Sequence, residues 1–553
     1  GFNHQDQVMT MEIPQIGTLI SAKGRTFTIR LLSDNEGFQP VISNGENSML
    51  TGQIGTHVSI QQTGVHVIAI VLSNWQEEAN GLMSRYIECN PIGELLNKDV
   101  FSRGVNQFPT AGAEVYPVCA DELKSLYVNN EKFNFSLGHL RRHTDVNAYI
   151  NPNSLFGRHL AILGQSGSGK SWTVAQLVQS TLRTMPNAHM ILLDLHGEYC
   201  WKSDDNKLKA AFDHSVMRYV DARDLEIPYW LLTYSELIDL LIEREDPGAS
   251  TQIAYLREVL LALRKKSNTH LDIERLSVDS PVYFSLAELY THFKKANEQQ
   301  TDFGKTKGAL YGQFDEFLIK LQSKLNDARY DFLFKPKRRT NSESLETLLK
   351  DFTGLTEPKR QVTVVDLSPV PSDVRPVVAA QLGRLAFEFN YWNPKRKDFP
   401  LQLICEEAHN YVPRANTTKY HGARVAMERI AKEGRKYGVG LTVVSQRPHE
   451  LSETVLSQCS NYICMRLTNP DDQNYVRSLV PEGETDLVNT LSSLARGEAL
   501  ILGEAIPLPT RFQVTPPSPT PNSQDADYYS EWSTPEFDLD VAKIVDNWRR
   551  QTR

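Results

Sequence analysis

The sequence has 553 residues, of which 40% are hydrophobic and 23% are charged, with a formal net charge of −8 at pH 7. This length and composition predict a globular protein of two or three domains with sizeable cores. The negative total excludes a surface coated in basic residues for nucleic acid, and no apolar run approaches the roughly 20 residues that span a membrane. We therefore expect a cytoplasmic protein without a membrane segment, in which any contact with DNA is local.

Short strand patterns separated by Gly, Asn and Asp fill the first part of the chain. They include residues 26–32, 57–63 and 65–72, in which β-branched and apolar residues dominate. Helical patterns are sparse here, and closing a sheet on itself is the usual way to avoid exposed strand edges. We predict a small β-barrel domain over residues 1–137.

A connector at residues 138–152 leads to a candidate phosphate loop. Residues 160–163 form an apolar run of strand length, and apolar side chains recur at helical spacing after the loop. The intervening glycines let successive backbone N–H groups surround a polyphosphate at a helix N-terminus, where the helix dipole favours negative charge. Lys170 would reach the β- and γ-phosphates of ATP, and the Ser171 hydroxyl would face Mg²⁺. The predicted ATP-binding residues are Gly164, Gln165, Ser166, Gly167, Ser168, Gly169, Lys170 and Ser171.

Further apolar strands alternate with helical patterns in the rest of the chain. Near-continuous apolar strands separated by helices predict a mostly parallel sheet covered on both faces, which is an α/β fold. We assign this core to residues 138–200 and 353–514, and a helical insertion to residues 201–352, where Thr233 and Glu236 form a candidate capping box. The predicted strands after the phosphate loop are residues 189–195, 362–367, 401–407, 440–446, 462–467 and 498–503.

Residues 515–553 begin with a polar, proline-rich run that is typical of an extended linker. A short helix is predicted after it, because Val541, Ile544, Val545 and Trp548 follow helical spacing. We expect this apolar stripe to dock either on its own subunit or on a neighbouring one.

Two adjacent acids follow the apolar strand at residues 401–405. ATP hydrolysis needs a carboxylate that organises the metal and a second one that polarises water, and Glu406 and Glu407 supply this pair. The alternative is a solvated helix N-terminus stabilised by its dipole. Gln446 ends another buried strand and is a candidate sensor of the γ-phosphate, or a simple polar strand end.

Five ordered segments together resemble the HerA family of HerA/FtsK-type hexameric ATPases. The resemblance extends into the predicted barrel, through the FSRGV and FP sequences of residues 101–109, and reaches IPLP at residues 506–509. It implies a RecA-like core that follows a barrel. The five segments are HLAILGQSGSGKS (residues 159–171), LLDLHGEY (192–199), EEAHNYVP (406–413), IAKEGRKYGVGLTVVSQRP (430–448) and LSQCSNYICMRL (456–467).

The resemblance also implies a homo-hexameric ring with ATP between subunits and double-stranded DNA in a central channel. Arg435 matches the arginine presented to the neighbouring subunit's ATP, and Arg158 resembles a family arginine near the γ-phosphate. Glu406 stands where many relatives have Asp, so its longer side chain would shift the carboxylate relative to Mg²⁺ and could slow turnover.

Two smaller groups of residues have open roles. Asp194, His196 and Glu198 follow a predicted strand and would either position water or metal or form a structural turn. Arg414 and Lys419 are candidate DNA contacts, with a simple surface loop as the alternative for each.

Three functions compete on this reading. The first is a helicase-like motor that couples ATP hydrolysis to DNA translocation, working with a partner effector in DNA end processing or anti-phage defence. The second is a ring scaffold that assembles and controls that effector, a nuclease or a sirtuin-like NADase docked on the tier of N-terminal barrels. The third is a pilus or secretion ATPase, which the β domain and the absence of a membrane segment disfavour.

Overall fold

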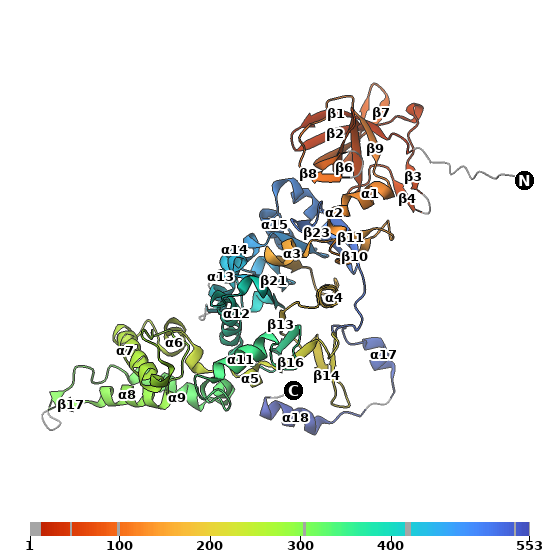
Figure 1. Cartoon of the computed structure of the whole chain (residues 1–553). Coiled ribbons are helices and arrows are strands. Elements are labelled where there is room, and N and C mark those ends of the chain that lie inside the picture. The colour runs from red at the N-terminus through yellow and green to blue at the C-terminus, as the bar shows by residue number, and fades with distance from the viewer. Residues whose placement is uncertain are drawn as a thin grey trace, which may run out of the picture. The chain divides into compact units, whose positions relative to one another are not determined.

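The computed structural model describes residues 13–44, 47–96, 100–301, 306–414, 422–535 and 538–551 (Figure 1). The chain forms two compact units, and each is described by itself. Unit 1 comprises Gly1–Thr184, Ser445–His449 and Leu456–Ser518, and unit 2 comprises Met185–Val444, Glu450–Val455 and Pro519–Arg553. Within the described ranges, every helix is too short or too polar to span a membrane.

Unit 1 begins with a closed β-barrel, as the sequence predicted. Its six strands follow the order β2-β1-β9-β5-β6-β7, pairing of β2 with β7 closes the barrel, and β8 (Val100–Arg103) adds to β7. In β2 buried and half-buried residues alternate, so that Phe27 and Ile29 point into the core with Leu19 and Ile60. The barrel strands are β1 (Gly17–Lys23), β2 (Thr26–Leu31), β5 (His57–Gln62), β6 (Val65–Ala79), β7 (Leu82–Leu96) and β9 (Glu114–Pro117). The hairpin of β3 (Val41–Asn44) and β4 (Asn47–Leu50) pairs separately.

The rest of unit 1 is built on a mixed sheet. β12 (Leu160–Leu163) pairs in parallel with β22 (Asn461–Cys464), and four antiparallel strands continue from β22 in the order β23, β24, β10 and β11. These are β23 (Glu498–Gly503), β24 (Thr510–Val514), β10 (Ser136–Leu140) and β11 (Asn147–Tyr149). The helices are α1 (Ala120–Leu126), α2 (Val128–Glu131), α3 (Pro152–Gly157), α4 (Lys170–Thr184), α15 (Pro470–Leu479) and α16 (Thr485–Val488). α14 (Glu453–Gln458) crosses the boundary between the units.

Unit 2 contains parallel strands in the order β21-β20-β13-β19-β16. They are β13 (Met190–Asp194), β16 (Met217–Asp221), β19 (Val362–Asp366), β20 (Leu401–Cys405) and β21 (Val439–Ser445). Every residue of β13, β19 and β20 is buried, as expected for a parallel sheet covered on both faces. Every residue of β12, which pairs in parallel with β22 in unit 1, is also buried. The predicted α/β core is therefore confirmed.

The strand β16 was not among the predicted strands. It lies at the end of its strand order, and four of its five residues are half-buried. An edge strand with one partner is only partly covered, so its sequence MRYVD lacks the apolar run that marks the interior strands.

Helices make up most of unit 2 between β16 and β19. Thr233 caps α6 (Tyr234–Leu241) as predicted, because its hydroxyl accepts a hydrogen bond from Glu236 N–H at 3.2 Å and the Glu236 carboxylate accepts one from Thr233 N–H at 3.4 Å. The aromatic rings of Phe293, Phe314 and Phe317 pack together in the core of this region. The other helices are α5 (Ala222–Leu225), α7 (Ala249–Ser267), α8 (Leu286–Glu298), α9 (Asp315–Asn326), α10 (Asp331–Phe334) and α11 (Ser344–Thr353), with the short strands β14 (Cys200–Lys202), β15 (Leu208–Ala210), β17 (Gln300–Thr301) and β18 (Thr306–Lys307).

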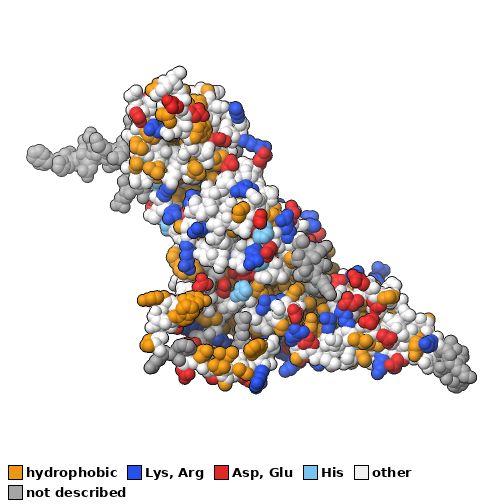
Figure 2. All heavy atoms as spheres, turned by 180° about the vertical axis from the view of Figure 1, so that it is seen from behind, with side chains coloured by type: hydrophobic (Ala, Val, Ile, Leu, Met, Phe, Trp, Pro, Cys, Tyr) orange, Lys and Arg blue, Asp and Glu red, His pale blue; other side chains and the backbone are white. Residues whose placement is uncertain are grey.

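Two long helices of unit 2, α12 (Arg375–Tyr391) and α13 (Gly422–Tyr437), pack against each other. A Cβ atom at Gly383 would lie 2.9 Å from Met427 Cε, so the absence of a side chain there permits the close approach. The chain ends in α17 (Tyr528–Ser533) and α18 (Val541–Arg550). Figure 2 shows hydrophobic side chains gathered over α17, where Tyr529 and Trp532 are exposed.

Candidate active site

The phosphate loop lies between β12 and α4 in unit 1. Gly167 and Gly169 have φ angles of +79° and +101°, in the left-handed region that favours glycine. A Cβ atom at Gly169 would lie 3.2 Å from Met465 Cε and 3.3 Å from the Gly497 nitrogen. The loop therefore curves tightly into the N-terminus of α4, where Lys170 is the first helical residue and Ser171 the second.

Two other segments of unit 1, residues 466–468 and Gly497, hold this loop in place. Gln165 N–H donates to the Arg466 carbonyl at 2.8 Å, and the Gln165 side-chain oxygen accepts from the Thr468 hydroxyl at 2.8 Å. Gly497 N–H donates to the Ser168 carbonyl at 3.0 Å. Because the loop is anchored in this way, its amide groups are preorganised for an anion. The sequence patterns did not identify Thr468 and Gly497 as supports, since no local motif links them to the loop.

Gln446 lies beside the loop in unit 1. The carbonyl of the preceding residue, Ser445, accepts a hydrogen bond from Gly164 N–H at 3.2 Å, which brings the end of β21 to the start of the loop. Gln446 itself is half-buried. This position is compatible with a γ-phosphate sensor, and the role stays a prediction.

Arg158 also lies in unit 1, at the end of α3. Its Nη1 pairs with Glu504 Oε2 at 2.8 Å, and its carbonyl accepts a hydrogen bond from Ser460 N–H at 3.0 Å. The guanidinium therefore has an acceptor within the chain, and contact with a γ-phosphate would compete with this ion pair. Its proposed role stays a prediction.

Glu406 is held at the end of β20 in unit 2. It is 1% exposed, and the Tyr199 hydroxyl donates to its Oε2 at 3.1 Å. Burial, followed by the charge of Glu406, raises the pKa of Tyr199 well above its ordinary value, so the hydroxyl keeps its proton. Tyr199 is a positioning residue that the sequence patterns did not identify, although it belongs to the segment LLDLHGEY.

Glu407 adopts a strained backbone conformation. Its φ angle is +49°, and its side chain lies 3.4 Å from His409 Nε2, measured at Oε2. A buried non-glycine residue in the left-handed region costs on the order of 1 to 3 kcal/mol, and such strain concentrates at functional sites. The geometry supports a functional role for Glu407, and the assignment as general base stays a prediction.

Asp194 ends β13 and braces the turn that follows. It accepts hydrogen bonds from Tyr199 N–H at 3.0 Å and from Glu198 N–H at 3.1 Å. Burial raises the pKa of Asp194 to about 7, and the nearby Asp366 contributes to the rise. These contacts favour the structural-turn alternative for Asp194. Over the residues that the structure describes, no group of three or more His, Cys, Asp or Glu side chains is arranged to hold a metal ion by itself.

Arg435 is exposed near the end of α13. A Cβ atom at the preceding Gly434 would lie 2.3 Å from the Val439 carbonyl oxygen, so the helix end packs closely against β21 and turns Arg435 outward. Arg414 is exposed, and its N–H donates to the Glu450 carbonyl at 2.8 Å. Lys419, the other candidate DNA contact, lies outside the described residues.

The chain matches two family models. Residues 135–386 match the model described as "Helicase HerA, central domain", and residues 400–519 match "Helicase HerA-like C-terminal". The "DNA double-strand break repair helicase HerA" of Saccharolobus solfataricus is 30% identical over 445 residues, which cover 79% of this chain and 79% of that protein. The protein of the same name from Pyrococcus furiosus is 27% identical over 439 residues, with 74% of each chain covered.

Solved structures are more distant. The structure of VirB4 of Thermoanaerobacter pseudethanolicus has 16% sequence identity and a TM-score of 0.45, with 72% of this chain and 98% of that chain covered. The sequence relationship is the stronger finding, because the family models and the relatives cover the phosphate loop and the paired acids together. The chain belongs to the HerA helicase family and is a P-loop ATPase.

Proposed function

We propose that this chain is the subunit of a hexameric motor that couples ATP hydrolysis to translocation along double-stranded DNA. The braced phosphate loop carries the proposal, because Gly167 and Gly169 and the contact from Gly497 form a cradle suited to a polyphosphate. The names of the relatives, which are DNA double-strand break repair helicases, support DNA as the substrate.

Each side chain of the site has a distinct task in this proposal. Lys170 binds the β- and γ-phosphates, Glu407 takes a proton from the attacking water, and Gln446 senses the γ-phosphate. Ser171 and Glu406 would hold Mg²⁺, which when bound neutralises charge on the β- and γ-phosphates. A serine hydroxyl and a buried carboxylate oriented by Tyr199 suit this hard cation, whose preferred ligands are oxygens.

Arg435 supports the hexamer. It has no hydrogen bond or ion pair within the described part of its own chain, and it projects from the surface of α13. An arginine that acts on the ATP of a neighbouring subunit stabilises the charge of phosphoryl transfer only when subunits assemble. We assign this role to Arg435, with Arg158 as a second arginine near the γ-phosphate once its pair with Glu504 opens.

The test of the motor compares Glu407→Gln with Lys170→Ala in purified full-length protein. Glu407→Gln should bind ATP and stall, whereas Lys170→Ala should lose both binding and turnover. Displacement of a triplex-forming strand from duplex DNA should need ATP and should disappear in both variants. A wild-type protein that hydrolyses ATP without displacing the strand would contradict translocation and favour the scaffold.

The scaffold is the second candidate, and one observation favours it. The tip of the β6–β7 hairpin exposes Leu82 and Met83, which are 72% and 50% exposed. Exposed apolar side chains on a domain without catalytic groups suit a protein contact. In this candidate the barrels form a tier that docks an effector, a nuclease or a sirtuin-like NADase, in anti-phage defence or DNA end processing.

The docking test must weaken binding of the effector to the barrel without disturbing ATP hydrolysis. Deletion of residues 1–137 also removes α1, α2 and part of β10, so the sharper test replaces Leu82 and Met83 with serine in the full-length chain. The effector should then bind more weakly while ATP hydrolysis is unchanged. Unaltered recruitment would place the docking surface elsewhere, with the exposed Trp548 of α18 as the next surface to test.

A further inference from the structure

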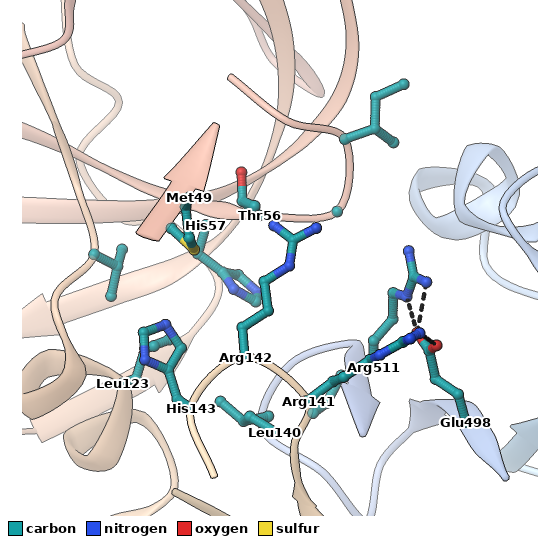
Figure 3. Close-up of a pocket in the computed structure, with 14 residues that line it drawn as sticks. Met49, Thr56, His57, Leu123, Leu140, Arg141, Arg142, His143, Glu498 and Arg511 are labelled. Carbon is teal, nitrogen blue, oxygen red and sulfur yellow. Dashed lines mark hydrogen bonds and ion pairs between the residues drawn. The ribbon is translucent and has the colours of Figure 1, made fainter. Parts of the chain in front are cut away.

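A cavity of about 280 Å³ opens in unit 1, and residues 164–171 of the phosphate loop are not part of its lining (Figure 3). Its walls come from the barrel strand β5 and from β10, β23 and β24 of the mixed sheet. Apolar side chains, among them Met49, Leu123 and Leu140, form part of the lining. The charged and histidine side chains of the lining are Arg141, Arg142, Arg511, Glu498, His57 and His143, and Thr56 and Thr510 add hydroxyl groups.

The cavity has an excess of positive charge. Glu498 is 1% exposed and pairs with Arg141 and with Arg511, whose Nε lies 2.8 Å from Glu498 Oε1. One carboxylate thus serves two guanidinium groups. The three arginines and one glutamate of the lining leave a formal excess of two positive charges.

Arg142 is the cation without an acceptor. Across the described ranges it makes no hydrogen bond or ion pair, although the neighbouring Arg141 and Arg511 both do. Burial, and then the positive charge of Arg511, lowers the pKa of Arg142. Arg142 is open to solvent, and the like charges beside its guanidinium favour the binding of an anion there.

His57 adds a second unsatisfied group. Its Nε2 is buried and has no hydrogen-bond partner among the described residues. Burial lowers the pKa of His57 to about 4, against a hydrogen bond to the Pro509 carbonyl that raises it, so the ring is neutral at pH 7. Its single N–H serves that carbonyl, and Nε2 is left as an acceptor. His57 and His143 both line the cavity, and Figure 3 draws both rings with Arg142 among the lining side chains. Buried polar groups normally have partners, so an orphan at a cavity wall is a place where a ligand or a water can bind.

We propose that this cavity binds a small phosphate-bearing molecule, with the phosphate held by Arg142 and the remainder against the apolar wall and the neutral His57 ring. A phosphate group carries up to two negative charges, which match the excess in the lining, and guanidinium groups bind its oxygens in a planar, bidentate geometry. The volume is close to the lower end of the roughly 300 to 1,000 Å³ of small-molecule sites. A DNA duplex does not fit such a cavity, because its major groove alone is about 12 Å wide.

The binding experiment uses the full-length Lys170→Ala protein, so that the phosphate loop does not contribute. Inorganic pyrophosphate is titrated by calorimetry. We expect it to bind this protein and to bind Lys170→Ala/Arg142→Gln about tenfold more weakly or worse, because a charge-assisted contact is lost. The control Lys170→Ala/Arg275→Gln removes an exposed arginine of unit 2 and should bind as the parent does. Equal affinity in all three proteins would overturn the site.

A second measurement needs no change in the cavity. Hydrogen exchange of the Lys170→Ala protein should slow in residues 138–146 and 496–514 when pyrophosphate is added. Unchanged exchange in both segments would overturn the proposal, as would slowing caused by a short DNA duplex and not by pyrophosphate. If the wild-type protein hydrolyses no ATP and yet pyrophosphate binds through Arg142, the proposed motor fails while this site stands.

Discussion

Gly497 offers a sharp test of how the phosphate loop is supported. Its φ angle is +79°, and a Cβ atom would lie 2.9 Å from Gln513 Nε2. Alanine at this angle costs about 1 to 2 kcal/mol. If the backbone shifts to relieve that strain, the hydrogen bond to the Ser168 carbonyl weakens, and a typical hydrogen bond contributes about 1 kcal/mol. Gly497→Ala should therefore weaken ATP binding about fivefold.

The matched control is Gly112→Ala in the barrel. Gly112 has a φ angle of +98°, and a Cβ atom there would have nothing within 4 Å, so the backbone strain is similar but the phosphate loop is not involved. Both variants should melt earlier than the wild type, and only Gly497→Ala should bind a fluorescent ATP analogue more weakly. If both variants bind the analogue with wild-type affinity, the contact from Gly497 does not preorganise the loop.

Three further outcomes follow from the site. Tyr199→Phe removes the hydroxyl that donates to Glu406, and a hydrogen bond to a buried charge contributes about 1.5 to 3 kcal/mol. We therefore expect kcat to fall about tenfold while the affinity for ATP changes little. An unchanged kcat would refute the positioning role of Tyr199. Mixed rings of Arg435→Ala and Lys170→Ala subunits should recover part of the turnover that each variant lacks alone, whereas full activity of an isolated monomer would exclude a role in trans. The affinity of the ring for duplex DNA should fall steeply with salt concentration if several subunits each neutralise phosphates. An affinity that does not depend on salt would count against a channel that contacts the DNA backbone.

The local motifs were predictable from the sequence, and their supports were not. Residues 164–171 and the acids Glu406 and Glu407 follow buried strands directly, so a short window contains the whole pattern. Gly497 and Thr468 act on the phosphate loop from about 300 residues away, and a single sequence gives no sign of such a contact. The same reason applies to Tyr199 and Glu406, whose hydrogen bond joins two segments far apart in the chain.

The edge strand β16 shows a second limit of prediction from the sequence. Its residues are mostly half-buried, so the apolar signal that identified the interior strands is weak there. The capping box of α6 was predictable, because Thr233 and Glu236 are three residues apart and the motif depends on spacing alone.

The contact between Gly497 and Ser168 also has a consequence for synthesis of the chain. β12 and the phosphate loop leave the ribosome long before β22 and Gly497, which complete the sheet and the loop in unit 1. At roughly 5 to 20 residues per second, the interval is on the order of tens of seconds. During that interval the nascent chain carries a phosphate loop without its braces, so tight ATP binding should begin only when the C-terminal strands have emerged.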